Sequence, residues 1–391
     1  MSHNFERKFP LILIADDDQS TRILLRLILK KDGYQVIEVE NGKECLTAWQ
    51  EHKPDMVLLD AMMPIMNGFE CCQQFNRIEG SESAIPVLMI TGLNDKESVD
   101  RAFSVGATDY ITKPIHPPVL RQRLARILKA AKAEAALKKS EAKLLKQNLR
   151  LQSELDRAAD YVRSLLPKPL DDKIKIAQYF APSAQLGGDI FDHYWLDSNH
   201  LVVYLLDVAG HGVKSALLSI SVLNILRSQS LYNTDFYEPW TVLSELNRMF
   251  PMNEKGDNYF TIWYGVINLR DRELVYASAG HPPGILIPQN NQKIKCLNTD
   301  NIPIGMLEKY PFEQTICPIS ADDTLYILSD GVYEVPLANG QIWGFDNLVK
   351  LIKKYHDTNC FELKNIWHYA QKQHKCQILD DDFSLLKITI Q

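Results

Sequence analysis

A long stretch without glycine or proline, from Val119 to Leu166, divides this chain into two parts. The stretch is rich in Ala, Leu, Lys, Arg and Glu, and prolines stand on either side of it. This composition predicts one continuous helix about 70 Å long, because an α-helix rises 1.5 Å per residue and prolines stop it. The chain has 391 residues, which is enough for two or three domains. We therefore expect domains at 1–118 and 167–391, with a helical linker at 119–166.

Apolar residues follow a 4-3-4-3 spacing along the second half of this predicted helix, which is typical of a coiled-coil seam. The seam consists of Leu144, Asn148, Leu151, Leu155, Ala158, Val162 and Leu165. Asn148 stands where a buried polar residue can fix register and dimeric state, so we expect a homodimer through 144–165. An earlier seam, at 120–131, is out of phase and indicates a stutter. The alternative is that the stripe packs against the chain's own domains.

The overall composition is ordinary for a globular protein and disfavours several classes of partner. The net charge of −6 provides no general attraction to nucleic acid or to membrane surfaces. The basic surplus at 121–146 is more typical of a solvated helix face than of a nucleic-acid site. No apolar run is long enough to span a bilayer, and the N-terminus does not resemble a secretory signal. Seven scattered cysteines indicate free thiols in a reducing cytosol, so we expect a cytoplasmic protein.

Short apolar runs alternate with helix-period segments across the first 118 residues. Continuous apolar runs of this length predict a doubly wound parallel sheet of five strands, covered by helices on both faces. Functional groups in such a sheet belong at the carboxyl ends of the strands. Five polar side chains follow or end these runs and should converge on one rim: Asp16, Asp17, Asp60, Thr91 and Lys113.

The stretches "ILIADDD", "LLDAMMPIMNG", "MITG" and "GATDYITKP" resemble the receiver domain of two-component response regulators. The resemblance implies that Asp60 is the phosphoacceptor and that Thr91 and Lys113 contact the phosphoryl oxygens. It also implies Mg²⁺ on Asp16, Asp17, Asp60 and the Met62 carbonyl, a switching aromatic at Tyr110 and a cis Lys113–Pro114 bond. The chemistry is coherent, because a carboxylate needs a metal and a cation to accept a dianionic phosphate. A sensor histidine kinase or phosphotransfer protein would be the phosphate donor.

Aspartates in separate short motifs mark the C-terminal two-thirds of the chain. They are Asp189 in "GGDIFD", Asp207 in "DVAGHG", Asp330 in "LYILSDGVYE" and the pair Asp381 and Asp382 in "DDFSLL". Carboxylates at strand ends beside glycines can meet although they are far apart in sequence. Hard divalent cations take oxygen ligands from several such segments. Two ions roughly 3.5–4 Å apart would generate a hydroxide and hold a phosphoryl group.

These motifs, together with "FTIWYGVIN" and "SAGHPP", resemble the metal-dependent protein phosphatases (PPM) over about 170–391. The similarity is to the bacterial branch that dephosphorylates anti-sigma-factor antagonists. It implies an α+β sandwich of two antiparallel sheets flanked by helices, with two Mn²⁺ or Mg²⁺ ions at one edge. By motif, Asp207 bridges both ions, the Val208 carbonyl helps to hold one, and Asp330 and Asp381 complete the second. Asp189 is expected to act through metal-bound water.

Two histidines also stand in these motifs. His211 is suited to protonate a leaving group, since imidazole titrates near neutrality, although a role in the turn is equally compatible with its position. His281 in "SAGHPP" is expected to organise a loop. "GGDIFD" is also similar to the Gly-Gly-Asp turn of diguanylate cyclases. That motif continues with Glu-Phe, where this chain has Ile190 and Phe191, and it does not require the later motifs.

The motifs together predict a response regulator whose phosphorylation at Asp60 controls a metal-dependent protein serine/threonine phosphatase. The resemblance implies a phosphorylated anti-sigma-factor antagonist as substrate, in a partner-switching pathway. The alternative is a non-enzymatic adaptor that binds a sigma factor or regulator through a phosphatase-like domain. Loss of an acidic ligand would favour the adaptor, and all of the acidic ligands are present.

Overall fold

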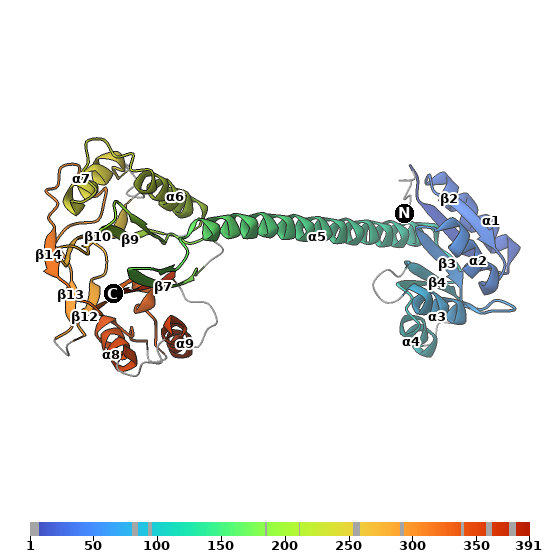
Figure 1. Cartoon of the computed structure of the whole chain (residues 1–391). Helices are drawn as coiled ribbons and strands as arrows, with labels where there is room; N and C mark the ends of the chain where they lie inside the picture. The colour runs from blue at the N-terminus through green and yellow to red at the C-terminus, as the bar shows by residue number, and fades with distance from the viewer. Residues whose placement is uncertain are drawn as a thin grey trace. The chain divides into compact units, whose positions relative to one another are not determined.

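The computed structural model describes residues 8–79, 85–92, 96–183, 186–210, 212–252, 259–289, 293–337, 340–356, 362–374 and 381–391. The chain forms two compact units, Met1–Asn148 and Leu149–Gln391. Helix α5 (Pro117–Leu165) begins in the first unit and ends in the second (Figure 1). Among the described residues, no helix has the length and apolar character that crossing a bilayer requires.

The first unit contains one parallel sheet of five strands in the order β2-β1-β3-β4-β5. Its strands are β1 (Leu11–Ala15), β2 (Gln35–Val39), β3 (Met56–Asp60), β4 (Val87–Thr91) and β5 (Asp109–Thr112). Helix α1 (Gln19–Lys31) and the start of α5 cover one face. The other face is covered by α2 (Gly42–His52), α3 (Gly68–Glu79) and α4 (Lys96–Ser104). The predicted doubly wound parallel sheet is confirmed, because buried strands need helices on both faces.

The second unit contains two antiparallel sheets. The first sheet has the order β14-β11-β10-β9-β8, and the second has the order β13-β12-β15-β16-β7-β6. The first comprises β8 (Ile190–Trp195), β9 (His200–Val208), β10 (Phe260–Asn268), β11 (Glu273–Ala279) and β14 (Thr315–Pro318). The second comprises β6 (Leu170–Asp171), β7 (Ile174–Ala181), β12 (Gly284–Ile287), β13 (Lys295–Leu297), β15 (Thr324–Leu328) and β16 (Phe383–Ile390).

Three apolar layers hold this sandwich together. Alternate residues of β9 and β10 point inward and meet the second sheet, where Leu205 and Trp263 pack with Ile327 and Leu386. The outer face of the first sheet is covered by α6 (Val213–Arg227) and α7 (Pro239–Met249). The outer face of the second is covered by α8 (Phe345–His356) and α9 (Leu363–His374). The predicted sandwich of two antiparallel sheets flanked by helices is confirmed.

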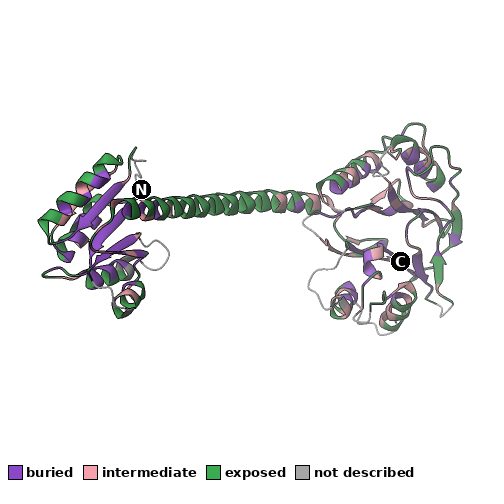
Figure 2. Cartoon of the chain, turned by 180° about the vertical axis from the view of Figure 1, so that it is seen from behind, coloured by how far each residue is buried: buried purple, intermediate pink, exposed green. Residues whose placement is uncertain are grey.

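Helix α5 packs at both of its ends and is exposed between them, as the green middle section in Figure 2 shows. The earlier seam lies in the core of the first unit, where Leu120 and Leu124 are fully buried. The far end packs on the second unit. There Leu155, Ala159 and Val162 contact Leu186 and Ala216.

Packing at the two ends explains the change of phase between the two seams, since each meets a different unit of the same chain. At the C-terminal end the buried alanine is Ala159, and Ala158, which the spacing selected, is exposed. The predicted seam is therefore partly used within the chain. Leu144 and Leu151 remain more than half exposed, at 56% and 59%.

Candidate active sites

The carboxyl ends of β1, β3 and β5 bring the predicted acidic residues of the first unit together. One carboxylate oxygen from each of Asp16, Asp17 and Asp60 lies within 4.8 Å of the others. The Lys113 ammonium nitrogen lies 3.0 Å from Asp16 Oδ2 and 3.2 Å from Asp60 Oδ2. Asp16 and Asp60 are buried, whereas Asp17 is exposed. Three oxygens so placed fit one hard divalent cation that stays open to solvent on one side.

Electrostatics at this rim disfavour the charged form of Asp60. Burial and the nearby Asp16 carboxylate raise the pKa of Asp60 to about 6, although Lys113 opposes them. Like charges at this distance disfavour ionisation, and a divalent cation would reverse that effect. The rim therefore has a charge pattern that fits one divalent cation.

The remaining predicted rim residues lie around this cluster. Thr91 is buried at the end of β4, and its carbonyl accepts a hydrogen bond of 2.8 Å from the Lys113 backbone N–H. Tyr110 is half-buried and stacks edge-on against Phe103. The Lys113–Pro114 bond is cis, as predicted. The Met62 side chain is exposed, at 62%.

In the second unit, the predicted aspartates stand at adjoining ends of strands from both sheets. Asp189 directly precedes β8, Asp207 lies near the end of β9, and Asp330 opens a short 3₁₀ turn after β15. The pair Asp381 and Asp382 precedes β16. Two hydrogen bonds join the sheets here. Ser384 Oγ donates to Asp189 Oδ2 over 2.6 Å, and the Asp189 N–H donates to Asp382 Oδ2 over 3.2 Å.

The Gly-Gly motif allows this close approach. A Cβ atom on Gly187 would lie 2.0 Å from Asp382 Oδ2, and one on Gly188 would lie 2.6 Å from the Val208 carbonyl oxygen. No side chain fits at such distances, so both glycines are needed for the backbone to pass against these oxygens. The Val208 carbonyl, which sequence motifs select as a ligand, therefore faces the Gly187–Asp189 turn.

These carboxylates lie close enough to repel one another. Burial, followed by Asp330, Asp381 and Asp382, raises the pKa of Asp207 to about 7, against a hydrogen bond with Asp189. The pKa of Asp189 is also raised, chiefly by burial and then by Asp207 and Asp382. Its Oδ1 atom is buried without a hydrogen-bond partner. A buried, unpartnered oxygen among repelling carboxylates fits the donor set of divalent cations.

This cluster is wider than the rim of the first unit. Among the described residues, only the Asp16, Asp17 and Asp60 group brings three ligand oxygens within 4.8 Å of one another. Ligands shared by two ions roughly 3.5–4 Å apart spread over a larger region than ligands of one ion. Asp207 and Asp330 are half-buried and Asp381 is exposed, so the cluster opens toward solvent.

The structure gives Asp382 a role that the sequence did not predict, and it does not describe His211. His211 lies outside the described residues, so the structure does not place its ring. Asp382, which was not given a ligand role, is buried and accepts hydrogen bonds from the Ser183 N–H and the Asp189 N–H. It holds the Gly-Gly turn in place. The sequence signal is the second carboxylate of the pair, directly before a strand, where successive side chains point to opposite faces.

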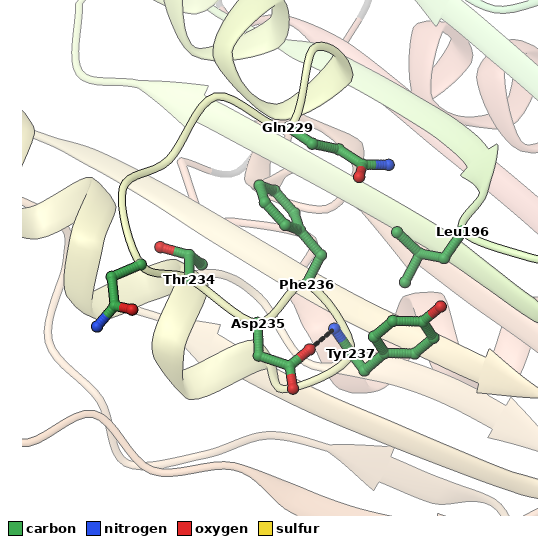
Figure 3. A pocket seen from close by; sticks show the side chains of 7 residues that line it. Leu196, Gln229, Thr234, Asp235, Phe236 and Tyr237 are labelled. Atoms are coloured by element: carbon green, nitrogen blue, oxygen red, sulfur yellow. Dashed lines mark hydrogen bonds between the residues drawn. The ribbon is translucent and has the colours of Figure 1, made fainter.

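A cavity of about 510 Å³ lies apart from this cluster (Figure 3). It lies beside the β8–β9 turn, at the opposite ends of these strands from Asp189 and Asp207. The lining residues are Leu196, Gln229, Asn233, Thr234, Asp235, Phe236 and Tyr237. Two of its polar side chains already have hydrogen-bond partners, since Asp235 accepts from the Tyr237 N–H and the Tyr237 hydroxyl donates to Asp197. We therefore assign it no part in the chemistry.

The raised pKa of Asp207 predicts how the stability of the metal-free protein depends on pH. Folded Asp207 keeps its proton up to a pKa of about 7, whereas an unfolded Asp releases it near 3.9. The stabilisation is therefore fully present below about pH 4 and is lost as pH rises through 7. The melting temperature of EDTA-treated protein should fall between pH 5 and 8, and saturating Mn²⁺ should restore it. A metal-free melting temperature that does not change over this range would contradict the assignment.

Comparison with known proteins finds one matching family model in each part of the chain. The family model for the response regulator receiver domain matches residues 12–125, and the model for stage II sporulation protein E (SpoIIE) matches residues 197–391. Two Bacillus subtilis proteins are both 29% identical to this chain: the phosphoserine phosphatase RsbP over 247 residues and the phosphoserine phosphatase RsbU over 239 residues. Each match covers 60% of this chain.

A solved structure supports the fold of the second unit. The SiaA-PP2C domain of Pseudomonas aeruginosa aligns with a TM-score of 0.54 at 16% identity, covering 63% of this chain and 99% of that one. At this identity the likeness shows the fold alone. The aligned region spans 59% of the length of RsbP and 70% of that of RsbU.

Proposed function

Because this chain joins a receiver domain of the response-regulator family to a PPM-type phosphatase domain of the SpoIIE family, we propose that it is a metal-dependent protein serine/threonine phosphatase under receiver control. The observation that carries the proposal is the cluster of repelling carboxylates on Asp189, Asp207, Asp330 and Asp381. A cluster of this kind is costly without cations and useful with them, since bound cations convert its repulsion into ligation.

The position of each residue in the cluster would determine whether it binds metal or orients water. Asp207, the Val208 carbonyl, Asp330 and Asp381 would hold two Mn²⁺ or Mg²⁺ ions, and buried Asp189 would orient the attacking water. When bound, the ions would activate water and neutralise charge on the phosphoryl group. The exposed side of the cluster, at Asp381, leaves room for a phosphorylated side chain. Asp382 would keep the Gly-Gly turn fixed through its hydrogen bonds to Ser183 and Asp189.

The substrate we propose is phosphoserine or phosphothreonine on a protein, and specifically a phosphorylated anti-sigma-factor antagonist. The support is the similarity to RsbP and RsbU, which are named phosphoserine phosphatases. The adaptor alternative predicts a degraded ligand set, whereas every aspartate of the set is present.

The test is hydrolysis of para-nitrophenyl phosphate by the full chain as a function of Mn²⁺ and Mg²⁺ concentration. We expect no turnover in EDTA and saturable turnover on adding metal. Release of phosphate from a phosphoserine peptide should follow the same metal dependence. Absence of turnover on both substrates, at metal concentrations that measurably bind, would favour the adaptor.

Control by the receiver is the second part of the proposal. A histidine kinase or phosphotransfer protein would phosphorylate Asp60, and helix α5 would carry the change to the phosphatase domain. The support is a set of contacts at the end of the helix. Ala159 packs with Leu186 and Ala216, and the Leu186 carbonyl accepts a hydrogen bond of 3.0 Å from the Gly212 N–H. The helix therefore ends beside the glycine-containing turns that flank Asp189 and Asp207.

We further propose a homodimer through the exposed part of α5. Leu144, Asn148 and Leu151 lie on the predicted seam and are exposed in the single chain. The seam residues Leu155, Val162 and Leu165 pack on the chain's own phosphatase domain, which leaves 144–151 for a partner helix. Pairing of this segment would bury leucines that water now surrounds.

A further inference from the structure

His281 lies where the chain crosses from one sheet of the phosphatase domain to the other. Strand β11 of the first sheet ends at Ala279, and strand β12 of the second begins at Gly284. The imidazole is buried, with 3% of the residue exposed. It belongs to the "SAGHPP" motif, and the proposed hydrolysis gives it no direct role. A buried polar ring is costly unless its contacts serve a purpose.

One ring nitrogen of His281 reaches the strand that faces Asp207. His281 Nδ1 lies 2.8 Å from Thr261 Oγ1, within hydrogen-bonding distance. Thr261 is directly opposite Asp207 in the antiparallel pairing of β10 with β9. Side chains of directly opposed residues lie on the same face of a sheet, with Cβ atoms about 4.5–5.5 Å apart. Thr261 is therefore the neighbour through which His281 can position the Asp207 carboxylate.

The other ring nitrogen, Nε2, is buried without a hydrogen-bond partner. Burial lowers the pKa of His281 to about 3, against a smaller opposing effect of the Leu328 backbone. The imidazole is therefore neutral at physiological pH and lies beside the end of β15. Leu328 is two residues before Asp330. One rigid ring thus stands between the strand opposite Asp207 and the strand that delivers Asp330.

A buried polar network fixes the backbone that carries the ring. Ser278 Oγ donates a hydrogen bond of 2.9 Å to the His281 carbonyl. Thr299 Oγ1 accepts from the Ser278 N–H and donates to its carbonyl, over 2.8 and 2.9 Å. Asn301 Nδ2 donates to Thr299 Oγ1 in turn. These hydrogen bonds fix the backbone at His281, so its ring has little freedom to move. A side chain that positions a metal ligand needs such rigidity.

We propose that His281 is a positioning residue which, through its hydrogen bond with Thr261 and the place of its ring between the two sheets, sets the separation of Asp207 and Asp330 and thereby the affinity of the site for divalent cations. The proposal rests on the proposed phosphatase function, because it assigns those two aspartates to metal binding. It predicts that changing the ring alters metal affinity although His281 contacts neither metal nor substrate.

The test measures Mn²⁺ affinity by electron paramagnetic resonance on the full chain, with the metal-free melting temperature as a second readout. His281→Phe keeps the ring volume but loses the hydrogen bond with Thr261. We expect Mn²⁺ to bind it about 10–100-fold more weakly, the usual cost of losing a residue that orients a metal ligand. The metal-free melting temperature should fall little, because the Thr261 hydroxyl left without its partner is half-buried and can be reached by water.

Conservative variants separate positioning from space filling. His281→Asn keeps a nitrogen near the Nδ1 position and should bind Mn²⁺ more tightly than His281→Phe. Thr261→Val, at a half-buried position, should weaken binding in the same direction and remains informative if the histidine variants do not fold. The double variant His281→Phe with Thr261→Val should bind Mn²⁺ no more weakly than His281→Phe alone, because both substitutions break the same hydrogen bond. His200→Phe, at the far end of β9, is the matched control and should bind Mn²⁺ normally.

The outcomes distinguish this inference from the function on which it rests. Wild-type Mn²⁺ affinity in both His281→Phe and Thr261→Val would overturn the positioning role. Equal weakening in His281→Asn and His281→Phe, with a lowered metal-free melting temperature in both, would also overturn it, because that pattern reports packing alone. Wild-type Mn²⁺ affinity in Asp207→Asn would instead show that the metal site itself is wrongly assigned.

Discussion

Replacing Asp207 with Asn is expected to abolish Mn²⁺ binding and to lower hydrolysis of para-nitrophenyl phosphate by about three orders of magnitude or more. The reason is that Asp207 is the carboxylate on which the repulsion from Asp330, Asp381 and Asp382 converges. A bound metal contributes several kcal/mol of charge stabilisation in the transition state, and each 1.36 kcal/mol is tenfold in rate. Asp330→Asn should behave in the same way.

The fold should survive both substitutions, because neutralising one member of a repelling group relieves strain on the others. The melting temperature of the metal-free variant should therefore equal or exceed that of the metal-free wild type. Asp197→Asn, at the opposite end of the same sheet, is the matched control and should keep full turnover. Wild-type turnover of Asp207→Asn at saturating Mn²⁺ would exclude this cluster as the catalytic site.

Much of this arrangement could be predicted from local sequence patterns. Continuous apolar runs in the first unit predict its strands. In the second unit, apolar runs that end at Asp207 and Asp330 predict both the strands and the residues at which they end. A carboxylate at a strand end has few directions available, because the sheet fixes its neighbours. The doubly wound sheet and the two-sheet sandwich follow from the same patterns together with the family resemblance.

Other features depend on contacts that no spacing in the chain expresses. The pairing of Thr261 with Asp207, and the placing of His281 between the sheets, depend on tertiary register across distant strands. The helix stripe presented a different difficulty. At about 100° per residue, Ala158 lies about 60° to one side of Leu155 and Ala159 about 40° to the other, so both flank the apolar stripe. Only the surface at Ala216 selects Ala159. Apolar spacing indicates that a face is buried but does not say what buries it.

Coupling between the two domains requires an element with two arrangements, and α5 is the only continuous connection between them. The end of α5 contacts Leu186 and Ala216. Helix α6 also reaches the Gly-Gly turn, where Ser219 Oγ donates a hydrogen bond of 2.6 Å to the Gly188 carbonyl. A displacement of the helix end would therefore change the packing next to Asp189. Such a displacement acts on hydrolysis only as far as it favours one of two populated arrangements.

Acetyl phosphate with Mg²⁺ is expected to label Asp60 and to change the rate of Mn²⁺-dependent hydrolysis. Asp60→Asn should lose both the label and the change. Inserting four residues after Ala136 should leave the label intact but remove the change, because four residues rotate the downstream seam by roughly 50° at 3.5 residues per turn. An insertion of seven residues is the matched control, since it lengthens the helix but keeps the same face toward a partner, and should preserve the response.

Sedimentation of these proteins identifies the arrangement that carries the signal. A dimer through Leu144 and Leu151 should persist in the seven-residue insertion, and Leu144→Lys with Leu151→Lys should dissociate it, because charges on a seam oppose pairing. A monomeric wild type with and without acetyl phosphate would exclude pairing of the helices. An unchanged response after the four-residue insertion would show that the signal reaches the phosphatase domain without the helix. If the response survives seven inserted residues but not four, the signal depends on which face of α5 meets its partner. The length of the helix would then not matter.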